Sequence, residues 1–276
     1  MPFESRIDTH AHFIPPFYRT ACKDSGNGRP DGMPAIPVST LVMLKPVKNL
    51  LDNATILLAI LQNAGQRSFA LETNHHGTYL GDPAFNDVFT ELNRRKARVF
   101  IHPTTPCTKH PGSHSQSAVT MLPQFPNPMF EFMFDTARAL INLFLSGTIE
   151  RCPDITFVIP HAGGALPPVI QRFCSFATDI LGSEVDINLQ VVRETFKRQF
   201  YFDLAGFPFP DQIHGLLRFS PPEKLLYGSD YPFTPAKGVG ILAQKMEAGL
   251  EETFSDALVR TAIYSGNAMR LLNINQ

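Results

Sequence analysis

The feature that most constrains the fold is an alternation of strand-like and helix-like segments along most of the chain. Short apolar runs rich in β-branched and aromatic residues predict strands at 7–13, 55–60, 68–74, 98–102, 155–161, 200–204 and 224–230. Apolar residues three or four positions apart predict helices at 84–96, 129–145, 166–181, 187–198, 238–250 and 255–272. Strands that alternate with helices pair in parallel through right-handed crossovers. We therefore expect an α/β fold, a (β/α)8 TIM-type barrel formed by one domain over residues 1–276.

The number of strands does not match a regular barrel. Seven strands are found where eight are needed, and a βαβ unit takes about 30 residues or more. A loop rich in Gly and Pro covers residues 26–37, so only residues 41–73 remain before the strand that ends at Asn74. We expect the barrel to be irregular, or one βα unit short, between about residues 38 and 67.

Composition excludes several classes of protein. The chain has 276 residues, a formal net charge of −1, and 43% hydrophobic residues. A near-neutral balance gives no electrostatic reason to bind nucleic acid or an anionic membrane surface. No apolar run approaches the roughly 18 residues of a membrane span, and the start does not resemble a secretory signal. The four cysteines form no CxxC pair, which favours reduced thiols and a cytoplasmic location.

Two histidines near the start form the clearest chemical motif. His10 and His12 lie two positions apart in a strand-like run, so both imidazoles project to the same face of one element. Three further polar residues, His102, His161 and Asp230, each stand where a predicted strand ends. In a parallel barrel the carboxyl ends of the strands surround one site.

These five residues together predict a mononuclear metal site. Imidazole and carboxylate ligands suit Zn²⁺, with Mn²⁺ as the alternative, and a catalytic site keeps positions open for water or substrate. Taken singly, His102 reads as a histidine at the edge of the core and Asp230 as a turn cap. The aromatic residues Phe130, Phe132 and Phe134 read as packing residues of a helix.

Four motifs carry a resemblance to a known family. They are HAHFIPP at 10–16, FIHP at 100–103, PHAGG at 160–164 and LYGSDYP at 226–232. With them the chain resembles the amidohydrolase superfamily branch typified by aminocarboxymuconate semialdehyde decarboxylase. Four further segments are most similar to fungal 6-methylsalicylate decarboxylases: THAHFIPPFYR, MPAIP, TNHHGTYLGDP and HPTTPC. The resemblance covers nearly the whole chain outside residues 38–67.

The resemblance implies a site and a reaction. It assigns His10, His12, His102 and Asp230 to the metal and places His161 beside the metal and the substrate. It implies a homodimer that removes CO₂ from a 2-hydroxybenzoate such as 6-methylsalicylate, forming 3-methylphenol (m-cresol). The proton donor to the ring is expected to be Asp230 first and His161 second. Phe13 and Asn74 are further candidates for contact with the small aromatic acid.

Two other interpretations stay open from the sequence. A metal-dependent hydrolase on the same scaffold would cleave a lactone or an amide, with Asp230 taking a proton from water. A chain that lacks one βα unit could instead be inactive, because the gap would leave sheet edges unpaired.

Overall fold

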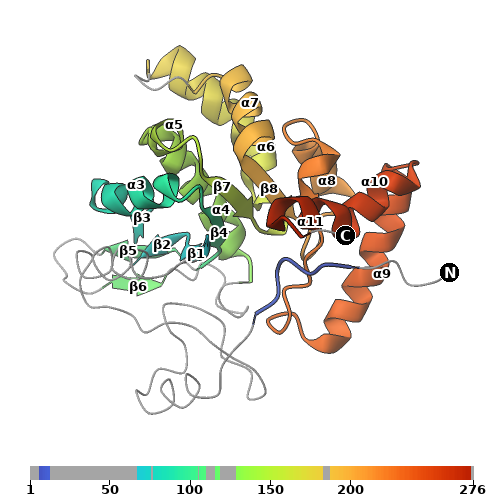
Figure 1. The fold of residues 1–276 in the computed structure, drawn as a ribbon. Helices are drawn as coiled ribbons and strands as arrows, with labels where there is room; N and C mark the ends of the chain where they lie inside the picture. Colours follow the sequence, from blue (N-terminus) through green and yellow to red (C-terminus); the bar gives the residue numbers. More distant parts are fainter. Residues whose placement is uncertain are drawn as a thin grey trace, which may run out of the picture.

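A parallel sheet with helices on its outer side forms the centre of the structure (Figure 1). The structure is a computed structural model that describes residues 6–12, 67–75, 77–104, 106–109, 116–118, 129–182 and 187–274, with only the backbone at 107–109 and 116–118. The five strands of the sheet run in the order β1-β4-β7-β8-β9. They are β1 (Ser68–Glu72), β4 (Arg98–His102), β7 (Thr156–Ile159), β8 (Phe200–Asp203) and β9 (Leu225–Leu226).

The segment from Ile7 to His12 extends this sheet beyond β9. Ala11 forms a parallel bridge with Tyr231, and the Thr9 and His12 amides donate to the Tyr227 and Tyr231 carbonyl oxygens. The N-terminal segment, predicted as the first strand of the barrel, therefore lies beside the segment predicted as its last strand. Two small antiparallel pairs lie outside the sheet: β2 (Asn74–His75) with β3 (Thr78–Tyr79), and β5 (Cys107–Lys109) with β6 (Gln116–Ala118).

Helices follow the strands as the alternation predicts. The α-helices are α3 (Asn86–Arg94), α4 (Glu131–Leu145), α5 (Thr148–Arg151), α6 (Leu166–Ser175), α7 (Leu189–Gln199), α8 (Asp211–Leu216), α9 (Ala236–Thr253), α10 (Ala257–Thr261) and α11 (Asn267–Leu272). Short 3-10 or π turns are η2 (Pro83–Phe85), η3 (His161–Gly163), η4 (Phe176–Ile180), η5 (Pro222–Lys224) and η6 (Ala262–Gly266). The short helices α5 and α8 were not predicted, because four to six residues carry too little periodicity.

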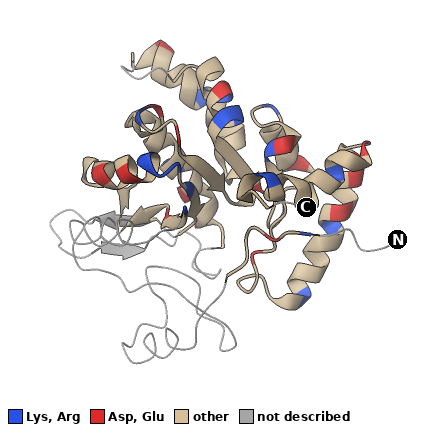
Figure 2. Cartoon of the chain, viewed as in Figure 1, with Lys and Arg blue, Asp and Glu red and all other residues tan. Residues whose placement is uncertain are grey.

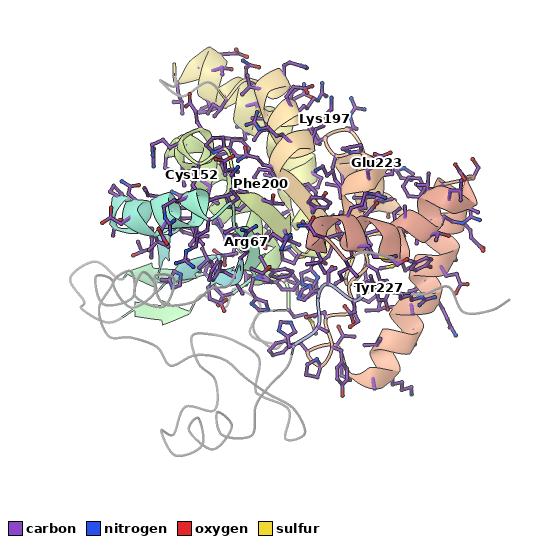
Figure 3. The ribbon with its side chains drawn as sticks, in the orientation of Figure 1. Arg67, Cys152, Lys197, Phe200, Glu223 and Tyr227 are labelled. Atoms are coloured by element: carbon purple, nitrogen blue, oxygen red, sulfur yellow. The ribbon has the colours of Figure 1, made fainter. Side chains whose placement is uncertain are left out.

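Aromatic side chains join the sheet to its outer helices. Phe200 is fully buried, and its ring centroid lies 5.0 Å from that of Phe157 and 4.9 Å from that of Phe196 on α7. Figure 3 shows Phe200 at the centre of the molecule and Lys197, one turn earlier on α7, at the outside. Strands buried on both faces are characteristic of parallel sheets, which explains their nearly continuous apolar runs.

The outer helices carry charges of both signs (Figure 2), as the near-zero net charge leads one to expect. Among the described helices, none combines the length and the apolar composition required to cross a bilayer. Six of the seven predicted strand segments lie in the sheet or at its edge. The seventh, at 55–60, and the stretch expected to be shortened lie outside the described residues, apart from Arg67.

Candidate metal centre

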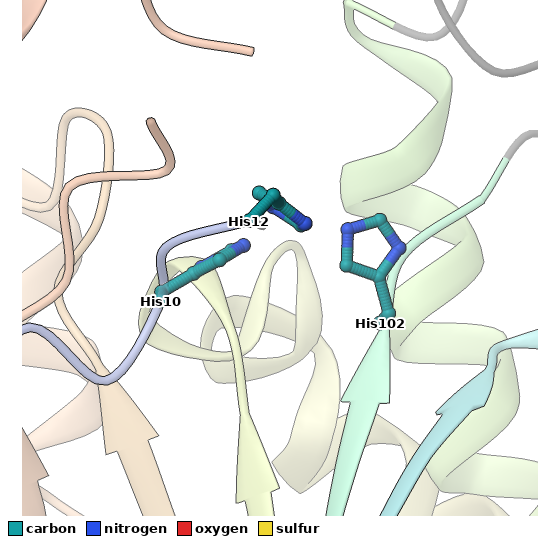
Figure 4. A group of neighbouring side chains, drawn as sticks. All are labelled: His10, His12 and His102. Atoms are coloured by element: carbon teal, nitrogen blue, oxygen red, sulfur yellow. The ribbon is translucent and has the colours of Figure 1, made fainter. Parts of the chain in front are cut away.

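The predicted ligands meet at the carboxyl ends of the strands, although they come from opposite ends of the sequence. His102 is the last residue of β4, and Asp230 follows β9 by four positions. The Asp230 amide donates to the His10 carbonyl oxygen at 2.7 Å, which places the N-terminal histidines beside Asp230. Figure 4 shows the rings of His10, His12 and His102 pointing toward one another.

Two overlapping groups of three residues have the spacing of a metal site. The ligand atoms of His10, His12 and His102 lie within 4.8 Å of one another, and so do those of His10, His161 and Asp230. The Oδ1 atom of Asp230 lies 3.2 Å from Nε2 of His12 and 3.3 Å from Nε2 of His10. Neighbouring ligands about 2.1 Å from one ion are about 3.0–3.4 Å apart, so these atoms are spaced as ligands.

The environment of His10 supplies the test of whether an ion fits. Its side chain is buried, and Nε2 makes no hydrogen bond to any described residue although a carboxylate oxygen lies close by. An unsatisfied buried nitrogen is costly. A divalent cation between His10 and Asp230 would satisfy both groups, and their donor types suit Zn²⁺ or Mn²⁺.

Three histidines have Nδ1 beside an oxygen acceptor, which directs Nε2 to the centre of the cluster. Nδ1 of His10 lies 3.0 Å from Oδ2 of Asp203, and Nδ1 of His102 lies 3.3 Å from Oε2 of Glu72. Nδ1 of His161 lies 3.3 Å from the Ala205 carbonyl oxygen. Oxygen acceptors at Nδ1 are the usual partners of histidines that bind a metal through Nε2.

Sequence reasoning missed Asp203 and Glu72. Each is the last residue of its strand, β8 and β1, and each is an acid at the end of an apolar run. The strand-end signal that found His102 and Asp230 missed both acids, because the predicted strands ran past them to Asn74 and Leu204. Asp203 is fully buried, whereas the side chain of Glu72 is 26% exposed.

The pKa values of His161 and Asp230 are both lowered by their surroundings. Burial and the nearby His10 lower the pKa of His161 to about 4. Burial raises the pKa of Asp230, but the hydrogen bond from His12 and the charges of the histidines outweigh it and lower the pKa to about 2. At neutral pH, His161 is therefore a neutral imidazole and Asp230 a carboxylate.

The pKa values of His10 and His12 shift in opposite directions. Burial lowers the pKa of His10, but Asp203 and Asp230 together outweigh it and raise the value above its usual range. Burial, together with the neighbouring His102 and His10, lowers the pKa of His12 despite its contact with Asp230. His12 therefore loses its proton more readily, which favours metal binding.

His161 lies in a tight turn after β7. Both His161 and Ala162 have φ near 53°, a left-handed conformation that is uncommon outside glycine. Gln212 on α8 stabilises this turn, because its Nε2 donates to the His161 and Gly164 carbonyl oxygens at 2.9 and 2.8 Å. The turn places the imidazole against His10, with ring centroids 5.0 Å apart.

Aromatic rings surround the cluster. The Phe132 ring lies 4.7 Å from His161, and the Phe233 ring lies 4.7 Å from His12. The expectation of packing residues was wrong for Phe130 and Phe134, which are 45% and 51% exposed. Phe132 does pack, but against a site histidine. Helical periodicity shows which residues share a face of α4 but not what that face contacts.

The two predicted substrate contacts are placed differently. Asn74 is buried beyond the end of β1, where its Nδ2 donates to Asp135 at 2.8 Å and its Oδ1 accepts from the Gly77 amide at 2.9 Å. These two contacts connect the β2–β3 turn to α4, and a role with substrate stays a prediction. Phe13 lies outside the described residues.

Similarity to known proteins agrees with this geometry. A model of the amidohydrolase family (Amidohydro_2) matches residues 46–274. The chain is 34% identical over 209 residues to decarboxylase macB of Penicillium terrestre, covering 73% of this chain and 57% of the relative. It is 34% identical over 170 residues to the 6-methylsalicylic acid decarboxylase of Penicillium expansum, covering 62% of this chain and 49% of that protein. The chain thus spans about half the length of these relatives.

Solved structures show the same fold. The crystal structure of an enzyme named amidohydrolase II superposes with a TM-score of 0.75 at 27% identity, covering 98% of this chain and 100% of the other. A 5-carboxyvanillate decarboxylase of Novosphingobium aromaticivorans, crystallised with manganese, has a TM-score of 0.63 at 15% identity over 94% of this chain and 68% of the other. Because the family model matches most of the sequence and the predicted ligands converge in the fold, this chain belongs to the amidohydrolase family.

Proposed function

We propose that this protein is a metal-dependent, non-oxidative decarboxylase of a 2-hydroxybenzoate, with 6-methylsalicylate as substrate and 3-methylphenol and CO₂ as products. The observation that carries the proposal is the convergence of His10, His12, His102 and Asp230, with His161 beside them. The decarboxylases among the relatives support the choice of reaction.

We assign the metal to His10, His12, His102 and Asp230, with Zn²⁺ as the expected ion and Mn²⁺ as the alternative. When bound, the ion supplies positive charge that orients the carboxylate and phenol oxygens of the substrate and stabilises the phenolate. The neighbouring rings of Phe132 and Phe233 offer an apolar wall suited to a benzene ring. Phe13 and Asn74 remain candidates for the same wall.

His161 is assigned to substrate binding. Its Nδ1 lies 3.3 Å from the Ala205 carbonyl oxygen, so Nδ1 carries the proton and Nε2 carries a lone pair toward the cluster. Because its pKa is about 4, the imidazole is neutral at pH 7, and its Nε2 accepts a hydrogen bond from the phenol group of the incoming substrate before that group loses its proton and becomes the phenolate. That contact holds the benzene ring of the substrate so that its carboxyl-bearing carbon lies near Asp230.

Asp230 is assigned to proton transfer. Loss of CO₂ requires that the carboxyl-bearing ring carbon first gain a proton; the bond to the carboxylate then breaks and its electrons return to the ring. A carboxyl group with a pKa of about 2 holds almost no proton at pH 7. Asp230 must therefore take the proton from the substrate or solvent and transfer it in the same turnover.

The test of this function is an assay of CO₂ and 3-methylphenol from 6-methylsalicylate by protein loaded with Zn²⁺ or Mn²⁺. The matched control is 2-methylbenzoate, which keeps the methyl and carboxylate groups but lacks the phenol oxygen, and it should not react. Release of acid from lactones or amides without CO₂ would instead identify a hydrolase. No turnover of any substrate by protein that binds the ion would support an inactive relative.

The protein is also expected to be a cytoplasmic homodimer that acts on a small aromatic acid without nucleic acid or membrane partners. Sedimentation of the purified protein tests the oligomeric state directly. A monomer that decarboxylates at full rate would contradict the dimer and leave the assigned reaction intact.

A further inference from the structure

One buried carboxylate connects two histidines of the site. Asp203 is completely buried at the end of β8. Its Oδ2 lies 3.0 Å from Nδ1 of His10. Its Oδ1 accepts hydrogen bonds of 3.0 Å from the backbone amides of His161 and Ala205. The carboxylate therefore contacts the ring of one histidine and the backbone of the other.

Close packing confines the pair formed by Asp203 and His10. A Cβ atom at Gly228 would lie 2.8 Å from Cβ of His10 and 3.3 Å from Cγ of Asp203. Neither Oδ2 of Asp203 nor Nδ1 of His10 makes a well-aligned hydrogen bond to any described residue. A small rotation of the ring that aligns its N–H with the carboxylate satisfies both atoms at once.

The chemistry of the pair determines the position of the imidazole proton. An ionised carboxylate only accepts hydrogen bonds, and a neutral imidazole has one N–H and one lone pair. With the N–H at Nδ1 facing Asp203, the lone pair of His10 is at Nε2. This is the atom that lies 3.3 Å from Asp230 inside the cluster.

We propose that Asp203 is a positioning residue that fixes His10 in the Nδ1–H tautomer with one oxygen and holds the backbone of His161 with the other. A single side chain thus fixes the tautomer of a proposed metal ligand and the position of the imidazole that is assigned to substrate binding. The importance of this role rests on the proposed metal-dependent function, but the tautomer itself is a property of the metal-free protein.

The variant Asp203→Asn changes the tautomer expected for His10 without changing the shape of the side chain at position 203. Its Oδ1 can still accept from the two backbone amides, and this fixes the orientation of the amide group, because the opposite orientation would face N–H groups with an NH₂ group. The Nδ2 group then donates to Nδ1 of His10. The imidazole proton moves to Nε2, and the lone pair needed by the ion is lost although the volume is unchanged.

The first measurement is the tautomer of His10 by ¹⁵N NMR of metal-free protein with labelled histidine. Because Asp203 and Asp230 outweigh burial and raise the pKa of His10 above the ordinary value of about 6.5, the spectra are recorded at increasing pH until the His10 signals stop shifting, which shows that the ring is neutral. A His10→Gln variant identifies the His10 signals by their disappearance. Wild-type protein is expected to show Nδ1–H, and Asp203→Asn to show Nε2–H.

The second measurement is affinity for Zn²⁺ by competition with a chelator. Asp203→Asn is expected to bind about 10–100-fold more weakly than wild type, the usual effect of removing such a partner. Asp135→Asn is the matched control, because Asp135 is equally buried but accepts from Thr73, Asn74 and Tyr79 rather than from a histidine. Its affinity for Zn²⁺ is expected to stay within about twofold of wild type.

The outcomes separate this inference from the function. Nε2–H in wild type overturns the role of Asp203 even if Asp203→Asn fails to fold. Folded Asp203→Asn with the wild-type tautomer and affinity overturns it as well. Wild-type protein that shows Nδ1–H but binds neither Zn²⁺ nor Mn²⁺ refutes the metal-dependent function while supporting the tautomer assignment.

Discussion

The backbone amide of Asp230 donates a 2.7 Å hydrogen bond to the carbonyl oxygen of His10. This bond joins the N-terminal segment to the loop that follows β9, at the point where both carry proposed metal ligands. The geometry of the proposed metal site therefore depends on a backbone contact between distant parts of the chain, and side-chain identity alone does not establish it.

Addition of the ion should raise the stability of the protein. A cation that binds only the folded state adds about 2.7 kcal/mol at a free concentration one hundred times its Kd. We expect the thermal midpoint to rise with Zn²⁺ or Mn²⁺ in wild type and to respond little in His12→Ala. An equal rise in both proteins would locate the bound ion elsewhere.

Asp230 and His161 should differ in their effect on the metal. Asp230→Ala removes a proposed ligand and a proton carrier, so metal content and turnover should both be lost. His161→Ala should retain the metal and lose at least about tenfold in kcat, because it removes a group that binds the substrate. Metal analysis and CO₂ release from the same preparations decide the point. A near-normal rate in His161→Ala would show that its assigned role is wrong.

Asp8 should stabilise the contact between the chain ends. Its Oδ1 accepts from the Ser229 amide at 3.0 Å and from the His10 amide at 3.1 Å, and its Oδ2 accepts from the Ser229 hydroxyl. Asp8→Ala should lower the free energy of unfolding by about 1–2 kcal/mol and weaken metal binding. Chemical denaturation measures the first effect.

A surface carboxylate provides the control for Asp8. Glu194 pairs with Lys197 at 2.9 Å, and both side chains are 53% exposed. Glu194→Ala should change stability by at most about 0.5 kcal/mol. Equal losses in the two variants would mean that Asp8 has no special role at the site.

Gln212 should affect turnover without affecting the ion. In the wild type the Gln212 amide donates to the carbonyl oxygens of His161 and Gly164. In Gln212→Glu the side chain keeps its shape, but a carboxylate faces these two oxygens. The turn that presents His161 should distort, lowering kcat by up to about 100-fold with unchanged metal affinity. Gln212→Leu, which removes the donor without adding charge, should be affected less. If Gln212→Glu keeps full activity, the turn does not depend on this side chain.

Acid should destabilise the metal-free protein through His161. Its folded pKa of about 4 lies below the ordinary value of 6.5, so between these values the unfolded chain binds a proton that the folded one does not. Stability should therefore fall as pH decreases from about 6.5 to about 4, by up to about 1.4 kcal/mol per unit. The free energy of unfolding of wild type and of His161→Gln is measured by denaturation at a series of pH values. Plotted against pH, the two should differ in slope only in this window. Identical slopes would contradict the lowered pKa.

Much of the fold could be predicted from the sequence, because the parallel strands are short apolar runs separated by amphipathic helices. The convergence of His102 and Asp230 on the N-terminal histidine pair could be predicted for a related reason, because the carboxyl ends of parallel strands meet. Which of these residues bind the metal was implied only by the family resemblance and stays a prediction. The tertiary partners were harder to predict. Asp203 resembles an ordinary strand-end acid until its contacts with His10 and His161 are seen, and Phe132 lies on α4, whose local pattern does not show that it contacts His161.

The bridge between Ala11 and Tyr231 has a consequence for biosynthesis. The ribosome adds Asp230 more than two hundred residues after His10 and His12. While the residues between them are being synthesised, the nascent polypeptide therefore lacks one of the proposed metal ligands. We therefore expect tight binding of the proposed ion only after the segment that carries Asp230 has emerged and paired with the N-terminal segment.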